Sequence, residues 1–104
     1  MDVAEYHRRI DEALERVVRA LEALEEVEST AADGLVTIAF EDGTRWVLNR
    51  QSGNQQLWLA AGARAWHYRW DPGAETWRDD RDGHEIWRRL EALLGDKLGR
   101  TVQV

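Results

Sequence analysis

Cysteine is absent from this chain of 104 residues. Its absence excludes a disulfide framework, a zinc–thiolate site and any cluster ligated by thiols of this chain alone. Any metal that the chain binds must therefore be held by oxygen or imidazole ligands.

Long apolar segments are also missing. No run approaches the roughly 20 apolar residues that a membrane-spanning helix needs. The amino terminus shows neither a signal peptide nor an arginine-rich transit segment, because Asp2 and Glu5 come at once. We therefore expect a cytoplasmic protein of a prokaryote, with no membrane partner.

Positive charge is in short supply in one part of the chain. The formal net charge is −6; residues 1–34 hold ten acidic and four basic residues, whereas residues 35–104 hold ten of each. Nucleic-acid binding would need the opposite sign on one face. The distribution instead favours cations or a basic protein surface as partners.

Residues 3–24 show the apolar period of a helix, and Asp2 with Glu5 predicts a capping box at its start. One flank of the apolar stripe is mainly acidic and carries His7, Asp11, Glu15, Glu22, Glu25 and Glu26. Two like charges about 6 Å apart in water repel each other by roughly 0.7 kcal/mol. We expect a crowded flank that a bound cation would relieve; an ordinary solvated helix face is the alternative.

The apolar period changes to that of strands after residue 34. The predicted strands are 35–40, 45–51, 56–60, 65–70 and about 76–78. Asp42-Gly43 predicts a tight hairpin turn. Asp82 with Glu85 predicts a second capping box, and the helix that it opens ends before Gly99.

The order of helix, antiparallel meander and helix predicts an α+β fold of one domain, residues 1–104. We expect a two-layer α/β sandwich in which two helices pack on one face of a sheet of about five to six strands. Strand alternation then leaves the other face to water. The predicted residues of this open face are Asn49, Gln51, Gln56, Trp58, His67 and Arg69.

A large aromatic side chain among polar groups on an open sheet face has the composition of a protein-binding hot spot. The open face therefore predicts a docking surface centred on Trp58. The alternative is that Trp58 packs on the stem of Arg69 or under a loop.

Catalytic motifs are missing from the chain. It has no Gly-rich phosphate loop, no nucleophile elbow and no HExxH, and its serines, Ser29 and Ser52, have no histidine at motif spacing. His84-Glu85 lies too close in sequence for a Glu-x-x-His oxidase pair. We expect no dedicated active site.

Several stretches resemble the frataxin family in its bacterial CyaY form. They are Tyr6-His7-Arg8, Leu35–Phe40 with Glu41-Asp42-Gly43, Leu48-Asn49-Arg50-Gln51, Gln56-Leu57-Trp58-Leu59-Ala60 and Trp66-His67-Tyr68. The central Asn-Arg-Gln and Gln-Leu-Trp-Leu-Ala signature is much more specific than a generic strand pattern. The likeness covers nearly the whole chain.

The resemblance implies that an acidic ridge on the first helix and first strand binds ferrous or ferric iron weakly and reversibly. The carboxylates that it assigns as ligands, called the acidic ridge below, are Asp11, Glu15, Glu22, Glu25, Glu26, Glu28 and Asp33, with His7 as an additional candidate. It also implies docking of the open sheet face on a cysteine desulfurase and an iron–sulfur scaffold. The implied role is iron donor, regulator of the desulfurase, or both.

Alternatives stay open at this point. Residues 25–34 are shorter and less acidic than is usual in the family, and Arg19 interrupts the ridge, so fewer metal sites are expected. A pure interaction module, whose ridge docks to a basic partner while iron binding is incidental, is the second interpretation. Weak oxidation of iron on the ridge is another. We expect a monomer, with metal-induced oligomers as the alternative.

Overall fold

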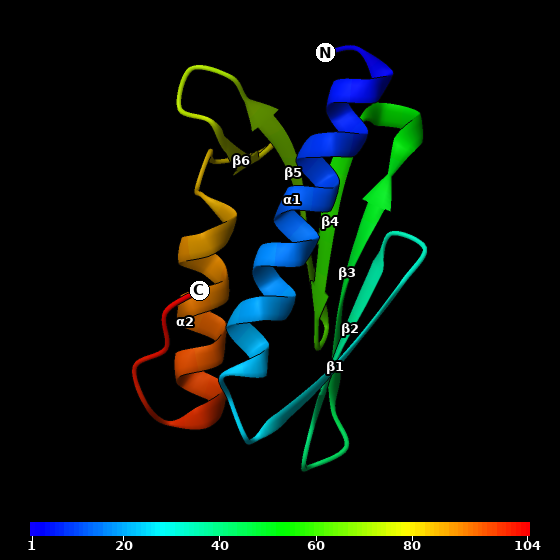
Figure 1. The fold of residues 1–104 in the computed structure, drawn as a ribbon. Coiled ribbons are helices and arrows are strands. Elements are labelled where there is room, and N and C mark those ends of the chain that lie inside the picture. The colour runs from blue at the N-terminus through cyan, green and yellow to red at the C-terminus, as the bar shows by residue number, and fades with distance from the viewer.

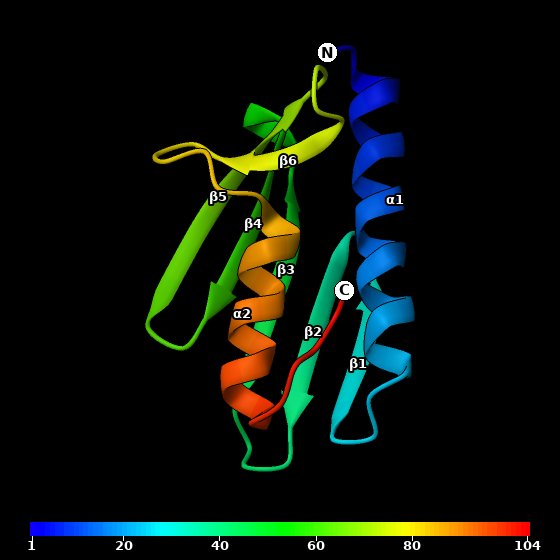
Figure 2. The same cartoon turned by 90° about the vertical axis from the view of Figure 1, so that its left-hand side faces the viewer.

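The computed structural model describes all residues, 1–104, as two helices beside a six-stranded sheet (Figure 1). In chain order the elements are α1 (Val3–Glu22), β1 (Val27–Ala32), β2 (Leu35–Phe40), β3 (Arg45–Gln51), the 3-10 turn η1 (Ser52–Asn54), β4 (Gln56–Ala61), β5 (Arg64–Asp71), β6 (Thr76–Asp79) and α2 (Ile86–Leu98). The strands form an antiparallel meander in sequence order. Both helices lie on the same face of the sheet (Figure 2), which confirms the predicted two-layer sandwich.

Helix α1 begins as its sequence predicts. The Asp2 carboxylate caps the helix by accepting the backbone N–H of Glu5 at 2.7 Å. The apolar stripe then turns toward the sheet, and its buried members are Tyr6, Ile10, Ala13, Leu14, Val17 and Leu21. Neither helix of the protein is long and apolar enough to cross a membrane.

The core lies between the helices and the near face of the sheet. It is one cluster of 24 buried residues, in which alternate strand positions such as Leu48, Leu59 and Tyr68 are fully buried. The strand positions that alternate with the open-face residues therefore meet the helices. Trp70 is the exception, because it is only half-buried and lies under the Arg9 guanidinium, 4.7 Å from its ring centre.

Strand β1 is an element that the sequence pattern did not predict. It pairs with β2 along its whole length, from Val27 opposite Phe40 to Ala32 opposite Leu35. Only Val27 of its six residues is buried, so this edge strand carries almost no hydrophobic alternation. The turn after it is Asp33-Gly34, with φ of +52° and +76°, a two-residue hairpin turn.

The predicted capping box at the start of α2 is wrong. Asp82 does not cap the helix, because its carboxylate accepts the backbone N–H of His84 at 3.0 Å. The helix starts later, with Glu85 as its N-cap residue and no side-chain cap. The reason is tertiary: Glu85 pairs with Arg78 across an antiparallel bridge, which holds its backbone extended. At the other end, Gly99 ends α2 in the left-handed region, as predicted.

The carboxyl-terminal residues turn back after α2 and run between the two helices (Figure 2). Val102 is buried in the core. The Arg16 guanidinium of α1 donates to the Val104 carbonyl at 2.9 Å, and the Val104 N–H donates to the Glu91 carboxylate of α2 at 3.1 Å. This tail therefore links the two helices on the side away from the sheet.

Tyr6→Phe should lower the free energy of unfolding by about 1–3 kcal/mol. The buried Tyr6 hydroxyl donates to the Gln56 carbonyl at 2.6 Å and accepts the Gln51 N–H at 3.1 Å, so its loss leaves both groups unpaired without opening a cavity. Urea unfolding measures the change. The control is Val3→Ala at a 65% exposed position, expected to stay within about 0.5 kcal/mol of wild type. Equal free energies of unfolding for the two variants would contradict the two hydrogen bonds assigned to the Tyr6 hydroxyl.

Candidate functional site

The acidic ridge follows one flank of α1, passes through the loop after it and reaches β1 and its turn (Figure 1). All of its carboxylates are exposed except that of Glu26, which is half-buried. The ridge therefore lies on the surface where α1 meets the edge of the sheet, and solvent or an ion reaches it freely.

Arg50 on β3 supplies a positive charge to the Asp11 end of this ridge. Its guanidinium donates to the Asp11 carboxylate at 2.6 Å and contacts His7 Nδ1 at the same time. Arg50 follows Leu48 on the helix-facing side of its strand, so its side chain extends under α1. The contact also fixes the Nδ1 edge of His7, which leaves Nε2 as the ring atom available to a ligand.

Two further ridge carboxylates have basic partners. Glu15 lies 3.8 Å from the Arg19 guanidinium, one turn along α1. Glu26 forms a two-pronged pair with Arg100, at 2.8 and 3.0 Å. The hydrogen bonds from Arg100 are the main cause that holds the pKa of Glu26 below its ordinary value. The crowding expected on this flank is therefore relieved in part, at these residues, by basic side chains of the chain itself.

The remaining ridge carboxylates, those of Glu22, Glu25, Glu28 and Asp33, form no ion pair. Glu41 joins them, because the pairing of β1 with β2 brings the end of β2 beside the start of β1. Glu25, Glu26, Glu28 and Glu41 line one small depression of about 260 Å³. Negative charge is thus concentrated at this end of the molecule.

No metal cage is preformed on the ridge. No three of its carboxylates bring oxygen atoms within 4.8 Å of one another, as the one such group in the protein does elsewhere, at Asp79, Asp82 and His84. An ion on the ridge would therefore be held by few protein oxygens and would keep most of its water. That arrangement predicts weak and poorly selective binding.

A groove of about 390 Å³ runs between α1 and the β1–β2 hairpin, beside the ridge. Its floor is apolar and includes Leu14, Val18 and Val36, whereas Asp11 and Asp33 stand among its polar lining residues. The ridge is therefore not an isolated row of charges but borders a concave apolar surface.

The open face of the sheet holds the other predicted residues together. Asn49, Trp58 and His67 lie directly opposite one another across β3, β4 and β5, and Gln51, Gln56 and Arg69 form the next row. The Trp58 ring stacks on the His67 ring, with 4.2 Å between centres and 20° between planes. Trp58 is half-buried, so it presents only part of its ring to solvent.

Gln56 differs from the prediction of a solvent-facing amide, because it is only 3% exposed. Its side-chain oxygen, Oε1, accepts the Trp58 indole N–H at 2.8 Å, and its side-chain nitrogen donates to Asp80 at 3.2 Å. The reason is the position of Asp80 just beyond β6, which strand alternation within β4 cannot show. Gln56 thus holds the Trp58 indole ring in one orientation.

Comparison with known proteins decides the family. The family model described as a frataxin-like domain matches residues 1–100. The chain belongs to the frataxin family. It is 36% identical to the iron-sulfur cluster assembly protein CyaY of Dechloromonas aromatica, with 98% of this chain and 97% of that protein covered. The CyaY of Paraburkholderia phymatum is 30% identical, with 100% and 98% covered.

Solved structures agree on the fold. Frataxin from Psychromonas ingrahamii superposes with a TM-score of 0.89 at 29% identity, covering 99% of this chain and 97% of that one. Trimeric frataxin from Saccharomyces cerevisiae gives a TM-score of 0.75 at 21% identity, with 88% and 80% covered, and shows the shared fold alone. The helix–meander–helix arrangement of this chain is therefore that of a frataxin.

Three charged residues beside the acidic ridge were not assigned to it from the sequence. Arg50 had a usable signal, because it shares the strand side of Leu48 and should point toward the helices. Placing Glu41 beside the ridge requires the pairing of β1 with β2, and placing Arg100 there requires the path of the carboxyl-terminal tail. Local periodicity shows neither the pairing nor the path.

Arg100→Gln should raise the pKa of Glu26 toward its ordinary value, since the hydrogen bonds from Arg100 are the largest cause that lowers it. A lowered carboxylate pKa in the folded protein stabilises it above the ordinary pKa, and this stabilisation is lost as the pH falls through the lowered value. Titration of the carboxyl carbon by NMR measures the shift.

The matched control is Arg88→Gln, which removes the same charge from an exposed residue with no contact to Glu26. It should leave the titration of Glu26 unchanged. A titration of Glu26 that is the same in both variants and in wild type would contradict the pairing.

Proposed function

We propose that this frataxin takes part in iron–sulfur cluster assembly, binding ferrous or ferric iron weakly on its acidic ridge and docking through its open sheet face on a cysteine desulfurase and scaffold. The observation that carries the proposal is the group of ridge carboxylates without ion pairs, Glu22, Glu25, Glu28 and Asp33, on a chain whose relatives are named as cluster assembly proteins. A cation there removes like-charge repulsion that no basic side chain removes.

Weak binding suits the proposed role, because a donor must release its ion. The ligands offered are exposed carboxylate oxygens, which favour hard cations, and the Nε2 atom of His7 at the Arg50 end of the ridge. Exposed ligands keep the ion hydrated and its exchange fast. Whether such binding produces metal-induced oligomers, and whether the free protein is the monomer in the cytoplasm that the sequence predicts, stay predictions.

The proposed docking surface is the open sheet face, with Trp58 at its centre. A half-buried aromatic ring stacked on His67 is held in one orientation, so a partner that covers it orders few groups on binding. Asn49, Gln51 and Arg69 surround it with hydrogen-bonding groups at the rim. Gln56 contributes by orienting Trp58 rather than by contacting the partner directly.

Catalysis is not part of the proposal. The relatives are named as assembly proteins, and a hydrated ion on exposed carboxylates is not enclosed by groups that would direct a reaction. Slow oxidation of ferrous to ferric iron on the ridge stays a prediction, since carboxylate oxygens favour the more highly charged ion.

A pure interaction module is the second candidate function. It is favoured by the internal pairing of Asp11, Glu15 and Glu26, which leaves less free charge for a metal than a fully unpaired ridge would. In that case the ridge and its apolar groove would receive a basic partner surface, and iron binding would be incidental.

Two measurements on one set of variants separate the candidates. Anaerobic titration with ferrous iron, followed by calorimetry, should show weak binding that falls at least threefold in the double variant Glu25→Gln, Glu28→Gln. The matched control, Glu75→Gln with Asp96→Asn, changes the net charge equally at two exposed residues without ion pairs and should bind as wild type does. Capture of the desulfurase should be reduced in Trp58→Ala.

The outcomes are distinct. Desulfurase capture that depends on the ridge, together with no uptake of ferrous iron, would establish the interaction module. Equal iron affinity in the ridge and control variants would place the iron elsewhere. A Trp58→Ala variant that is much less stable but still captures the desulfurase fully would show that Trp58 belongs to the core.

A further inference from the structure

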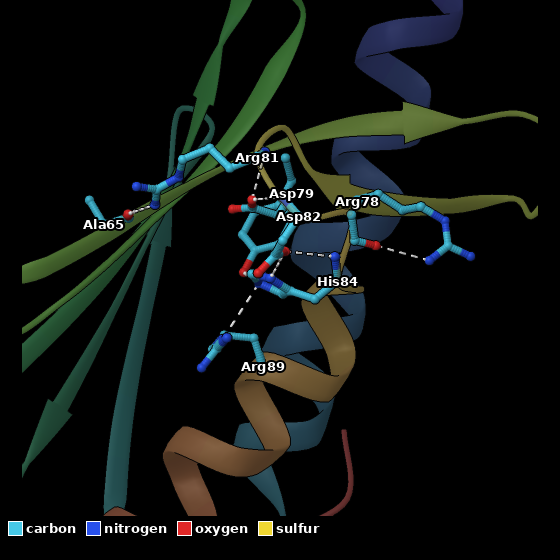
Figure 3. A network of polar contacts seen from close by, with 9 residues as sticks. Ala65, Arg78, Asp79, Arg81, Asp82, His84 and Arg89 are labelled. Carbon is cyan, nitrogen blue, oxygen red and sulfur yellow. Dashed lines mark hydrogen bonds and ion pairs between the residues drawn. The ribbon is translucent and has the colours of Figure 1, made fainter.

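The loop between β6 and α2 gathers three potential metal ligands (Figure 3). Asp79 ends β6, and Asp82 and His84 follow it in the loop. One ligand atom from each of the three residues lies within 4.8 Å of the others. This is the only group of its kind in the protein.

The loop holds these side chains in place through its backbone. One oxygen of the Asp79 carboxylate accepts the N–H groups of Arg81 at 2.8 Å and Asp82 at 3.1 Å. Gly83 has a φ of +77°, which turns the chain so that His84 comes back beside Asp82. The Asp82 carboxylate then contacts His84 Nδ1 at 2.6 Å. The cluster is therefore part of an ordered turn.

The second oxygen of Asp79, Oδ2, has no hydrogen-bond partner although the residue is only 5% exposed. Buried carboxylate oxygens without a partner are rare, because the cost of removing them from water is not recovered. The carboxylate that carries this oxygen is the one grouped with Asp82 and His84 (Figure 3). A cation held among the three side chains would give this oxygen the partner that it lacks.

The surroundings fix the state of the imidazole. Nδ1 faces the Asp82 carboxylate, so it carries the proton, and Nε2 accepts from the Tyr68 hydroxyl at 2.7 Å. Burial is the main cause that raises the pKa of Tyr68, with the charge of Asp79 adding to it, so this hydroxyl keeps its proton. A metal ion would replace the Nδ1 proton between His84 and Asp82.

The nearby arginines do not neutralise the cluster. Arg89 Nε stands 3.5 Å from His84 Nε2, on the far edge of the ring from Asp82. Arg81 and Arg78 point their guanidinium groups away, to the carbonyls of Ala65 and Gly83 respectively (Figure 3). Two carboxylates against one adjacent guanidinium leave a net negative site.

We propose that Asp79, Asp82 and His84 form a binding site for one divalent transition-metal ion, coordinated by an imidazole nitrogen and two carboxylate oxygens with water in the remaining positions. Imidazole with carboxylate suits zinc and its first-row neighbours. Ligands of one zinc ion, each about 2.1 Å from it, lie roughly 3–3.5 Å apart. The ligand atoms of the three residues lie within 4.8 Å of one another, and the Asp82 side chain is exposed, so a change of its rotamer can shorten that spacing. The site is independent of the ridge and of the proposed function.

Zinc titration of the full chain, followed by calorimetry and by the melting temperature, tests the proposal. Wild type should bind one zinc ion at this site and melt several degrees higher with it. Asp79→Asn and His84→Gln should each weaken this binding at least tenfold. Asp79→Asn keeps the Oδ1 acceptor of the turn and removes the unpaired charged oxygen, so the metal-free variant should be at least as stable as wild type.

The double variant Glu25→Gln, Glu28→Gln is the control and should bind zinc at this site as wild type does. Equal zinc affinity in wild type, Asp79→Asn and His84→Gln would overturn the proposal, and so would loss of all zinc binding in the ridge variant. Imidazole NMR of the unmutated chain gives a second readout. The resonances of His84 should move with zinc, whereas shifts confined to His7 or His67 would also overturn it.

Discussion

The structure depends on one constraint: the apolar stripes of both helices are buried against the same face of a six-stranded sheet. The helices cover one face of the sheet, and the other face stays in water because no element remains to cover it. This arrangement also turns the acidic flank of α1 outward, beside the edge strand β1. The two surfaces proposed to act in cluster assembly are therefore consequences of how the core is filled, and they lie on different sides of the molecule.

Charge on the ridge is balanced only in part. Arg50 from β3 and Arg100 from the tail reach Asp11 and Glu26, and both contacts also tie α1 or its following loop to distant parts of the chain. Where such partners stop, at Glu25, Glu28 and Glu41, the carboxylates crowd around one depression. A surface of this kind attracts cations without enclosing them, which is the physical basis for the loose and reversible iron binding that we propose.

Much of the fold followed from local pattern, and the failures have specific causes. Strands β2 to β5 alternate strongly and are joined by turn residues such as Asp42-Gly43, so their positions were predicted nearly to the residue. Strand β1 buries Val27 alone and so has no pattern. The start of α2 is set by the bridge from Glu85 to Arg78, which overrides the local capping signal at Asp82. The open-face residues were placed by alternation, whereas the burial of Gln56 depends on Asp80, from another strand end.

The rate of cluster formation on the scaffold tests the central claim most directly. The desulfurase, cysteine and ferrous iron would be combined anaerobically with the scaffold, and cluster absorbance followed with and without an equimolar amount of this protein. A donor should raise the rate and a regulator should change it in either direction, and the effect should be lost in a folded Trp58→Ala variant. Time courses that coincide with and without the protein would contradict a role in cluster assembly.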